Sequence, residues 1–318
     1  MSVGLVERRP FVTLFAAGAL SVSAMAPFHL WPILLFTLPV LYWSLDGEAG
    51  AQGPAWRSAA WRGWAFGFGY HLAGLYWIGF SFLVQAERFA ALMPFAISAL
   101  TAALGLFFAL AAAAYALVRP RLPSEISRIV ALALVVMVVE WLRGHILTGF
   151  PWNVLGYALT MPLPLMQWAG LVGIYGLTAV TVIALTTPVV VLAAASTATT
   201  RPARPWSLIL VATIAPLAFA TIYGVWQLGL HPSTFDPGVR LRLVQPSFSQ
   251  KDKFVESKRG EIFLRHLELS GNPPQPDADG VPRGRPTHIV WPEAAIPFFA
   301  RRNRKALAGF DNALPDDV

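Results

Sequence analysis

Long apolar runs dominate the first 230 residues of the chain. A helix needs about 20 apolar residues, within a range of about 17–25, to cross the hydrocarbon layer of a membrane. Seven runs approach or exceed this length, and the first two share a tight APFHLWP turn. We predict seven membrane-spanning helices, at residues 11–27, 29–45, 60–84, 90–118, 128–148, 165–195 and 206–228. The expected architecture of this part is a multi-pass α-helical bundle.

The first run also resembles a signal peptide, because ERR precedes it and AMA follows it as a cleavage-like site. A second apolar run comes at once, which favours an uncleaved helical hairpin.

The pattern changes beyond the last apolar run. Residues 239–245 (VRLRLVQ) alternate apolar and basic side chains, as a half-buried strand does. Residues 251–270 have the pattern of an amphipathic helix, and residues 271–286 have the composition of a loop. Residues 287–291 (THIVW) are nearly all apolar, as expected of a strand covered on both faces. The order strand, helix, strand predicts the start of an α/β layered domain. We therefore divide the chain into a membrane bundle (1–230), a linker (231–238) and an incomplete α/β domain (239–318).

Composition supports this division. The 318 residues are 56% hydrophobic and 13% charged, whereas a soluble domain has about 25% charged residues. Residues 1–230 contain 11 Arg, no Lys and 6 acidic residues, and residues 239–318 contain 13 Lys and Arg and 10 acidic residues. No nucleic-acid-binding motif accompanies the net charge of +7. We expect the bilayer, and not nucleic acid, to be the partner of the basic residues.

Arginine placement predicts the orientation, because cytoplasmic loops carry an excess of Lys and Arg. With a cytoplasmic N terminus, Arg88 and Arg143 are the only arginines of residues 1–230 that fall on the outer side. Seven spans then place everything after residue 230 outside the cytoplasm, in the periplasm of a bacterium with two membranes. The inner-side arginines are Arg8, Arg9, Arg57, Arg62, Arg119, Arg121, Arg128, Arg201 and Arg204.

Glycines recur in the third apolar run (GWAFGFGYHLAGLYWIGFSF, 63–82). Small residues at such spacings let helices approach closely, so we interpret them as a packing face. His71 in the same run is expected to be a hydrogen-bonded interior histidine. The glycines are Gly63, Gly67, Gly69, Gly74 and Gly79.

The fifth run ends in VEWLRGHILTGFPWNVLGY (139–157). Glu140 and Arg143 are three residues apart, so they share a helix face and can pair. Ionisable groups at membrane depth tend to be functional, although a structural ion pair is the alternative. The TGFPWN segment cannot be regular helix, and its Gly and Pro predict a re-entrant loop. Phe150, Trp152 and Tyr157 fit the aromatic belt of a membrane interface.

Glu293 stands directly after the second predicted strand, between two prolines in WPEAAIP. Ligands and chemistry gather at strand ends in open α/β sheets. Its apolar neighbours predict partial desolvation, which suits a carboxylate to general-base work. A buried structural carboxylate is the alternative. The chain has no cysteine, which excludes disulfides, cysteine metal sites and a cysteine nucleophile within these residues.

Two pairs of segments carry a family resemblance. VRLRLVQPSFSQKDKF followed by HIVWPEAAIP resembles the opening of a nitrilase-superfamily (CN hydrolase) domain. Ahead of it, seven apolar runs with GLYWIGFSF and EWLRGHILTGFPWNVLGY resemble the apolipoprotein N-acyltransferase family of lipoprotein biosynthesis. The resemblance extends over the whole chain and is much more specific than the WPE motif by itself.

The resemblance implies a monomeric acyltransferase of the bacterial inner membrane, with eight spans and a periplasmic αββα domain. Its catalytic triad is Glu, Lys and Cys, and it uses no cofactor or metal. The Cys takes an acyl chain from a phospholipid as a thioester, and the amine of a diacylglyceryl-cysteine lipoprotein then attacks it. Glu293 matches the general base. Loops such as 143–165 would guide acyl chains, so Phe150, Trp152, Phe254, Glu140 and Arg143 are candidate residues of a lipid or substrate path.

The chain departs from the family pattern in several ways. It contains no Cys, and the one Lys after Glu293, Lys305, lies too close behind it to match the catalytic lysine. The nitrilase-like part is much shorter than in the family, and an eighth apolar run is missing. Phe254 stands where many members have Trp, which removes an indole N–H donor. We expect a C-terminally truncated chain that is inactive by itself, with open strand edges in its half-domain.

Other functions remain open. Glu140, His71 and His145 with the broken TGFPWN segment would also suit a proton-coupled transporter. A natural chain that has lost catalysis could bind lipoproteins without acylating them. A nitrilase-type hydrolase of small amides is a weaker alternative, because soluble members need no membrane spans.

Overall fold

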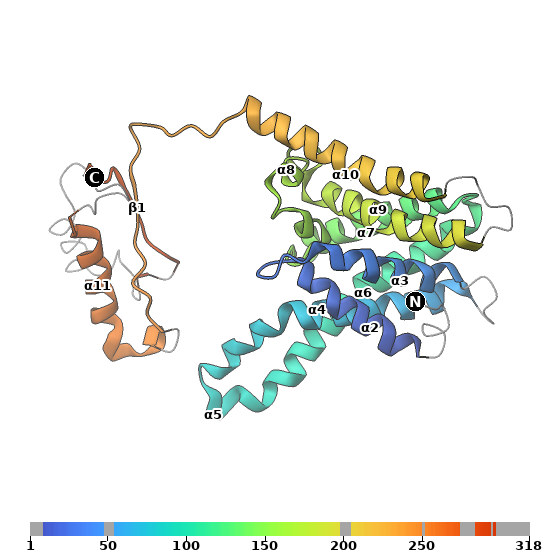
Figure 1. Ribbon diagram of the computed structural model, residues 1–318. Helices are drawn as coiled ribbons and strands as arrows, with labels where there is room; N and C mark the ends of the chain where they lie inside the picture. The colour runs from blue at the N-terminus through green and yellow to red at the C-terminus, as the bar shows by residue number, and fades with distance from the viewer. Residues whose placement is uncertain are drawn as a thin grey trace. The chain divides into compact units, whose positions relative to one another are not determined.

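The computed structural model describes residues 9–47, 54–197, 205–249, 252–273, 284–293 and 295–296, of which residues 191–197, 205–216 and 254 are described by their backbone alone. The chain forms two compact units, one of Met1–Leu83 and Glu87–Pro232 and the other of Val84–Ala86 and Ser233–Val318. The first unit is a bundle of helices, and the second contains a short parallel sheet and one longer helix (Figure 1).

Each of the seven predicted apolar runs forms helix within the described residues. The third run leaves regular α-helix at Leu75 and continues as 3₁₀ turns over Tyr76–Leu83. The α-helices are α2 (Pro10–Ser21), α3 (Leu34–Asp46), α4 (Ala55–Leu75), α5 (Ala86–Phe89), α6 (Met93–Val118), α7 (Glu125–His145), α8 (Leu163–Met166), α9 (Ala169–Thr197) and α10 (Pro205–Leu230). The 3₁₀ segments are η1 (Val22–Ala24), η2 (Trp31–Ile33), η4 (Tyr76–Leu83), η5 (Ala90–Leu92), η6 (Arg119–Arg121) and η7 (Leu155–Leu159).

Two helical stretches in the described part are long and apolar enough to cross a membrane, Ala86–Arg121 and Ala169–Val190. Three apolar helices are shorter: Pro10–Ala24, Trp31–Asp46 and Leu217–Leu230. At about 1.5 Å per residue, α2 and α3 are each shorter than the hydrocarbon layer of a bilayer. A helical part suited to a membrane is therefore present, and the count of seven spans stays a prediction.

Glycines let α4 pack closely against α2 on one side and α6 on the other. A Cβ at Gly63 would press on the Phe108 backbone of α6, and a Cβ at Gly69 would overlap the Phe15 carbonyl oxygen of α2. Gly18 of α2 in turn meets the Phe66 carbonyl of α4. The predicted glycine packing face is thus confirmed, and it places α4 in the middle of this part of the core.

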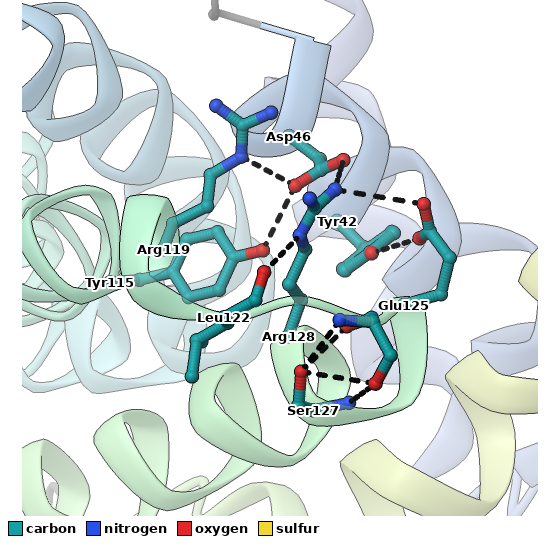
Figure 2. A network of polar contacts seen from close by, with 9 residues as sticks. Tyr42, Asp46, Tyr115, Arg119, Leu122, Glu125, Ser127 and Arg128 are labelled. Atoms are coloured by element: carbon teal, nitrogen blue, oxygen red, sulfur yellow. Dashed lines mark hydrogen bonds and ion pairs between the residues drawn. The ribbon is translucent and has the colours of Figure 1, made fainter.

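Figure 2 shows a polar cluster where α3 and α6 end and α7 begins. Asp46, the last residue of α3, accepts a hydrogen bond from Arg119 Nε (2.6 Å) and one from Arg128 Nη1 (3.2 Å). The Tyr115 hydroxyl also donates to Asp46 (3.3 Å). A single largely buried carboxylate therefore joins the ends of three helices, α3, α6 and α7.

The start of α7 is fixed by two further contacts in the same cluster. Ser124 caps the helix, because its hydroxyl accepts from Ser127 N (3.1 Å) while the Ser127 hydroxyl accepts from Ser124 N (3.1 Å). The Tyr42 hydroxyl of α3 donates to the carboxylate of Glu125, the first residue of α7 (Figure 2). These bonds set both where α7 begins and how it lies against α3.

The second unit has the predicted order strand, helix, strand. Strands β1 (Leu241–Leu243) and β2 (His288–Val290) pair in parallel, with Leu241 opposite His288 and Leu243 opposite Val290. Helix α11 (Arg259–Gly271) lies between them in the chain and follows two short 3₁₀ turns, η8 (Asp252–Phe254) and η9 (Glu256–Lys258).

Helix α11 buries its apolar stripe beside β2. Phe263 and His266 contact the ring of Trp291, with centroids 6.0 and 4.9 Å apart, and Trp291 Nε1 donates to Ser270 Oγ (2.8 Å). These contacts fix the position of Trp291, which directly precedes Pro292 and Glu293.

Two expectations about strand burial are wrong for the described residues. Leu241 and Leu243 are exposed, while the intervening Arg242 turns toward the end of α11 and donates to the Ser270 and Asn272 carbonyls (2.5 and 2.6 Å). Val290 of β2 is exposed as well, so β2 is not covered on both faces. The physical reason is that orphan carbonyls at a helix end attract a cation, and the two described strands have described helix on one face only.

Replacing Gly69 with Ala tests the helix packing. The added methyl group would overlap the Phe15 carbonyl oxygen, and overpacking of this kind costs about 1–3 kcal/mol. We expect a clear drop in melting temperature, followed by intrinsic tryptophan fluorescence in detergent. Gly229→Ala on α10, where an added Cβ meets no described atom within 4 Å apart from the backbone of its own helix, is the matched control and is expected to melt at or above the wild-type temperature. Equal losses in both variants would contradict the packing assignment.

Replacing Asp46 with Asn tests the polar cluster. The change removes the charge that holds Arg119 and Arg128 together, and hydrogen bonds to charged groups contribute about 1.5–3 kcal/mol. We expect lower thermal stability, whereas Glu87→Gln, on an exposed carboxylate of α5, is expected to change little. An Asp46→Asn variant as stable as wild type would show that the cluster contributes no net stability.

Candidate functional site

The chain leaves helical geometry directly after α7. Leu147, Gly149 and Asn153 all have positive φ (58°, 76° and 52°). At Gly149 any Cβ would also crowd the Gly144 carbonyl oxygen, at 2.5 Å, so only glycine suits this turn. The prediction that TGFPWN is not regular helix is confirmed. We call residues 146–154 the α7 loop.

Arg143 lies beneath the α7 loop and binds its backbone. The guanidinium donates from Nη1 to the carbonyls of Phe150 (2.9 Å) and Trp152 (2.6 Å), and from Nη2 to that of Asn153 (3.4 Å). The side chain of Arg143 is only 1% exposed. One fixed cation therefore satisfies three carbonyls that the irregular backbone leaves without partners in a helix or sheet.

Glu140 binds the residue that directly follows the α7 loop. Its Oε1 accepts from Leu155 N (3.0 Å) and lies 3.8 Å from Arg143 Nη2, and its Oε2 accepts from the Thr178 hydroxyl of α9 (2.7 Å). Thr178 in turn accepts from Gly156 N (3.0 Å). The predicted Glu140–Arg143 pair exists and is buried. Each oxygen of Glu140 accepts a hydrogen bond from another group, which offsets part of the cost of burying the pair, whereas Arg143 Nε has no hydrogen-bond partner among the described atoms.

Helix α4 contributes the remaining support. Tyr70 is fully buried and donates to the Asn153 carbonyl (2.9 Å). Its neighbour His71 is also fully buried, with Nδ1 2.8 Å from the Gly67 carbonyl, so the prediction of an interior hydrogen-bonded histidine is confirmed. The α7 loop is thus tied to α4 and α7, and α9 is bonded through Thr178 to Glu140 and to Gly156, two residues beyond the loop.

The outer side of the loop presents aromatic rings. Phe150 contacts Trp152 at 5.3 Å between ring centroids, and Trp152 contacts Trp77 of η4 at the same distance. Trp152 is 47% exposed, Tyr157 is exposed, and Leu147 is almost fully exposed. This surface suits contact with hydrocarbon or with an acyl chain, and the buried polar groups below it keep its shape.

The structure sorts the predicted site residues into three groups. Glu140 and Arg143 are buried supports of the loop and do not line a surface, while Phe150 and Trp152 lie on the loop itself. Glu293 belongs to the second unit and is exposed, so the expected partial desolvation is wrong for the described residues, which lack the segment that follows residue 296. The side chain of Phe254 lies outside the described part.

Three residues of this site escape sequence reasoning. Tyr70, Asn153 and Thr178 carry no charge and fit ordinary helix or loop patterns. Of these three residues, only Asn153 has a property that the sequence suggests. Asn tolerates a positive φ, and Asn153 lies in a segment with Gly and Pro.

A proton path through the bundle finds little support in this geometry. Both oxygens of Glu140 are occupied, and His145 is exposed and stacks on Trp141 at 4.5 Å. Within the described ranges, no group of three or more His, Cys, Asp or Glu side chains is placed to hold a metal ion.

Replacing Arg143 with Gln tests the support. It leaves Glu140 as a buried charge without its cation, and breaking a buried pair costs about 3–5 kcal/mol. We expect strong destabilisation in thermal unfolding. Replacing Glu140 with Gln in the same chain removes that charge, so the double variant is expected to be more stable than Arg143→Gln. If the double variant is the less stable one, the two side chains do not act as a pair.

Comparisons with known proteins cover nearly the whole chain. The family described as "Apolipoprotein N-acyltransferase N-terminal domain" matches residues 17–187. A protein named apolipoprotein N-acyltransferase from Rhodopseudomonas palustris is 42% identical over 299 residues, which is 94% of this chain and 54% of that relative. A protein of the same name from Bradyrhizobium diazoefficiens has the same identity and coverage. A third, from Agrobacterium fabrum, is 37% identical over 310 residues, which is 96% of this chain and 55% of that relative. The chain spans about half the length of these curated relatives.

Proposed function

The chain belongs to the apolipoprotein N-acyltransferase family, and from this premise we propose that it forms the membrane part and the base-bearing segment of an enzyme that N-acylates bacterial lipoproteins. The observation that carries the proposal is similarity to relatives of that name along 94% of the chain. The match includes the segments on either side of residue 232, so it supports both the bundle and the unit that follows it.

The proposed reaction has two steps. A cysteine thiolate attacks the ester carbonyl of a phospholipid, forms a thioester and releases the lysophospholipid. The α-amine of a diacylglyceryl-cysteine lipoprotein then attacks the thioester, forms the amide and regenerates the thiol. A carboxylate accepts the proton from the thiol and returns it to the departing oxygen of the lysophospholipid, and it later passes the proton of the amine to the departing thiolate. No cofactor enters this scheme.

Glu293 is the proposed carboxylate. It stands two residues beyond Trp291, which is anchored by Ser270 of α11, and three residues beyond the end of β2. A group at the end of a parallel strand is held by the sheet and is reachable from outside it. Its exposure among the described residues is compatible with a partner that approaches from another part of the protein.

The proposed setting is the bacterial inner membrane, with seven spans before residue 230, a cytoplasmic N terminus and a periplasmic nitrilase-like domain. Two apolar helices of spanning length and the helical form of all seven apolar runs support it. The proposed partners are a phospholipid acyl donor and a diacylated apolipoprotein acceptor, bound by a monomer. Phe150 and Trp152 of the α7 loop are proposed to guide the acyl chain, with Glu140 and Arg143 as their supports.

The 318 residues contain no cysteine, so the thioester step needs a thiol from outside them. We therefore expect no acyl transfer by these residues alone, and transfer only when the catalytic cysteine and lysine are supplied. The same lack of cysteine favours the second candidate function, binding of diacylated lipoproteins without acylation.

Replacing Glu293 with Gln tests the proposal. The complete reading frame that encodes these residues is expressed in phospholipid vesicles with a diacylated lipopeptide, and the mass of the lipopeptide is measured. We expect wild type to add one acyl chain and Glu293→Gln to lose at least 10²-fold in rate, the lower range for general-base catalysis. Glu268→Gln, at an exposed carboxylate of α11 paired with Arg265, is the matched control and should retain activity.

The outcomes separate the two candidate functions. A frame that encodes the thiol but yields no acylated lipopeptide would contradict the enzyme. Lipopeptide binding without a mass change, in a frame that encodes no cysteine, would favour the binding protein.

A further inference from the structure

Asn153 lies near the end of the α7 loop, where side chains of α4 and α7 both bind it. Its φ of 52° is in the left-handed region, which Asn adopts more readily than most residues. Its carbonyl accepts one hydrogen bond from the Tyr70 hydroxyl of α4 (2.9 Å) and one from Arg143 Nη2 of α7 (3.4 Å). The backbone of Asn153 is therefore held from two helices at once.

The side chain of Asn153 fits against a glycine. At Gly74, in the last turn of α4, an added Cβ would overlap the Nδ2 atom of Asn153, whereas the next described neighbour, Val22, stands at an ordinary 3.6 Å. Asn153 and Gly74 thus form a tight contact. The Asn153 side chain is the main group that would clash with a larger residue at position 74.

The same glycine is bound to the aromatic pair on the surface. The Gly74 carbonyl accepts from Trp77 Nε1 (3.1 Å), and the Trp77 ring contacts the ring of Trp152. Trp152 directly precedes Asn153. Two connections therefore link the α7 loop to the end of α4, one through Asn153 and Gly74 and one through the two indole rings.

We propose that Asn153 is a positioning residue that couples the α7 loop to the end of α4 and thereby fixes the separation of Trp77 and Trp152, two half-exposed rings that contact the acyl chain of the donor phospholipid. The proposal rests on the proposed function. Since the rings lie on different segments, a shift of the loop changes the width of the apolar surface between them. The contact acts on donor binding and leaves the chemistry of the transfer untouched.

The coupling is tested first without any enzymatic assay. The 318-residue chain is labelled with 5-fluorotryptophan in lipid nanodiscs, and the ¹⁹F signals of Trp77 and Trp152 are assigned with Trp77→Phe and Trp152→Phe. We expect Gly74→Ala to move the Trp152 signal, because the methyl group displaces the Asn153 side chain. Adding Asn153→Gly removes that side chain, tolerates the positive φ, and is expected to return the signal toward its wild-type position.

Two further variants keep this arm decisive. Asn153→Gly alone is expected to broaden or shift the Trp152 signal and serves if Gly74→Ala fails to fold. Gly170→Ala, with no described atom within 4 Å of its added Cβ, should leave the signal unchanged. The coupling would be overturned if Gly74→Ala left the Trp152 signal in its wild-type position. It would also be overturned if the double variant did not return the signal toward that position.

The second arm measures acyl transfer with the complete reading frame at varied phospholipid concentration. We expect Gly74→Ala to raise the KM for phospholipid about tenfold, which corresponds to about 1.4 kcal/mol, with kcat nearly unchanged, as for lost ground-state binding. Gly74→Ala with Asn153→Gly is expected to recover most of the loss. Equal losses in kcat and kcat/KM, or an unchanged KM, would overturn the role in donor binding. If wild type itself transfers no acyl chain, the proposed function fails, while the ¹⁹F arm still decides the coupling.

Discussion

The three hydrogen bonds from Arg143 to the carbonyls of the α7 loop are the interaction on which the candidate site depends. A backbone segment without helix or sheet bonds can lie at membrane depth only where protein satisfies its polar groups. A guanidinium does this well, because it presents several donors in a fixed plane and stays charged. The aromatic surface formed by Phe150 and Trp152 exists because the carbonyls beneath it have a partner.

The buried guanidinium of Arg143 in turn needs a counter-ion, because burying an unpaired cation costs free energy. Glu140 provides the charge from the same helix face, and it also accepts from Leu155 N and from the Thr178 hydroxyl. The two side chains therefore do more than balance each other's charge, because they also bind backbone groups in and next to the α7 loop. Removing either member leaves the other charge buried with the full desolvation cost, so the two side chains depend on each other.

Sequence patterns predict a large part of this structure for physical reasons. Apolar runs, glycine spacing and the i,i+3 charges depend on one-dimensional periodicity, and helices, the α4 packing face and the Glu140–Arg143 pair follow from it. The order of β1, α11 and β2 was predictable in the same way. Tyr70 and Thr178 could not be found, because their roles depend on which helices meet, and that is long-range information. The inward turn of Arg242 and the exposure of Glu293 depend on what covers a sheet face, which a strand pattern alone does not specify.

The two polar clusters together determine how α7 can lie in an apolar layer. Asp46 and Arg128 hold its first turn, and Glu140 and Arg143 hold its last two turns. Between Ile129 and Val139 the helix has eleven consecutive uncharged residues, or about 16 Å at 1.5 Å per residue, much less than a hydrocarbon thickness of about 30 Å. For α7 to span, at least one cluster must lie within the apolar layer. The Asp46 cluster is partly exposed and the Glu140–Arg143 pair is buried, so the buried pair is the one suited to that depth, and with it the loop that it supports.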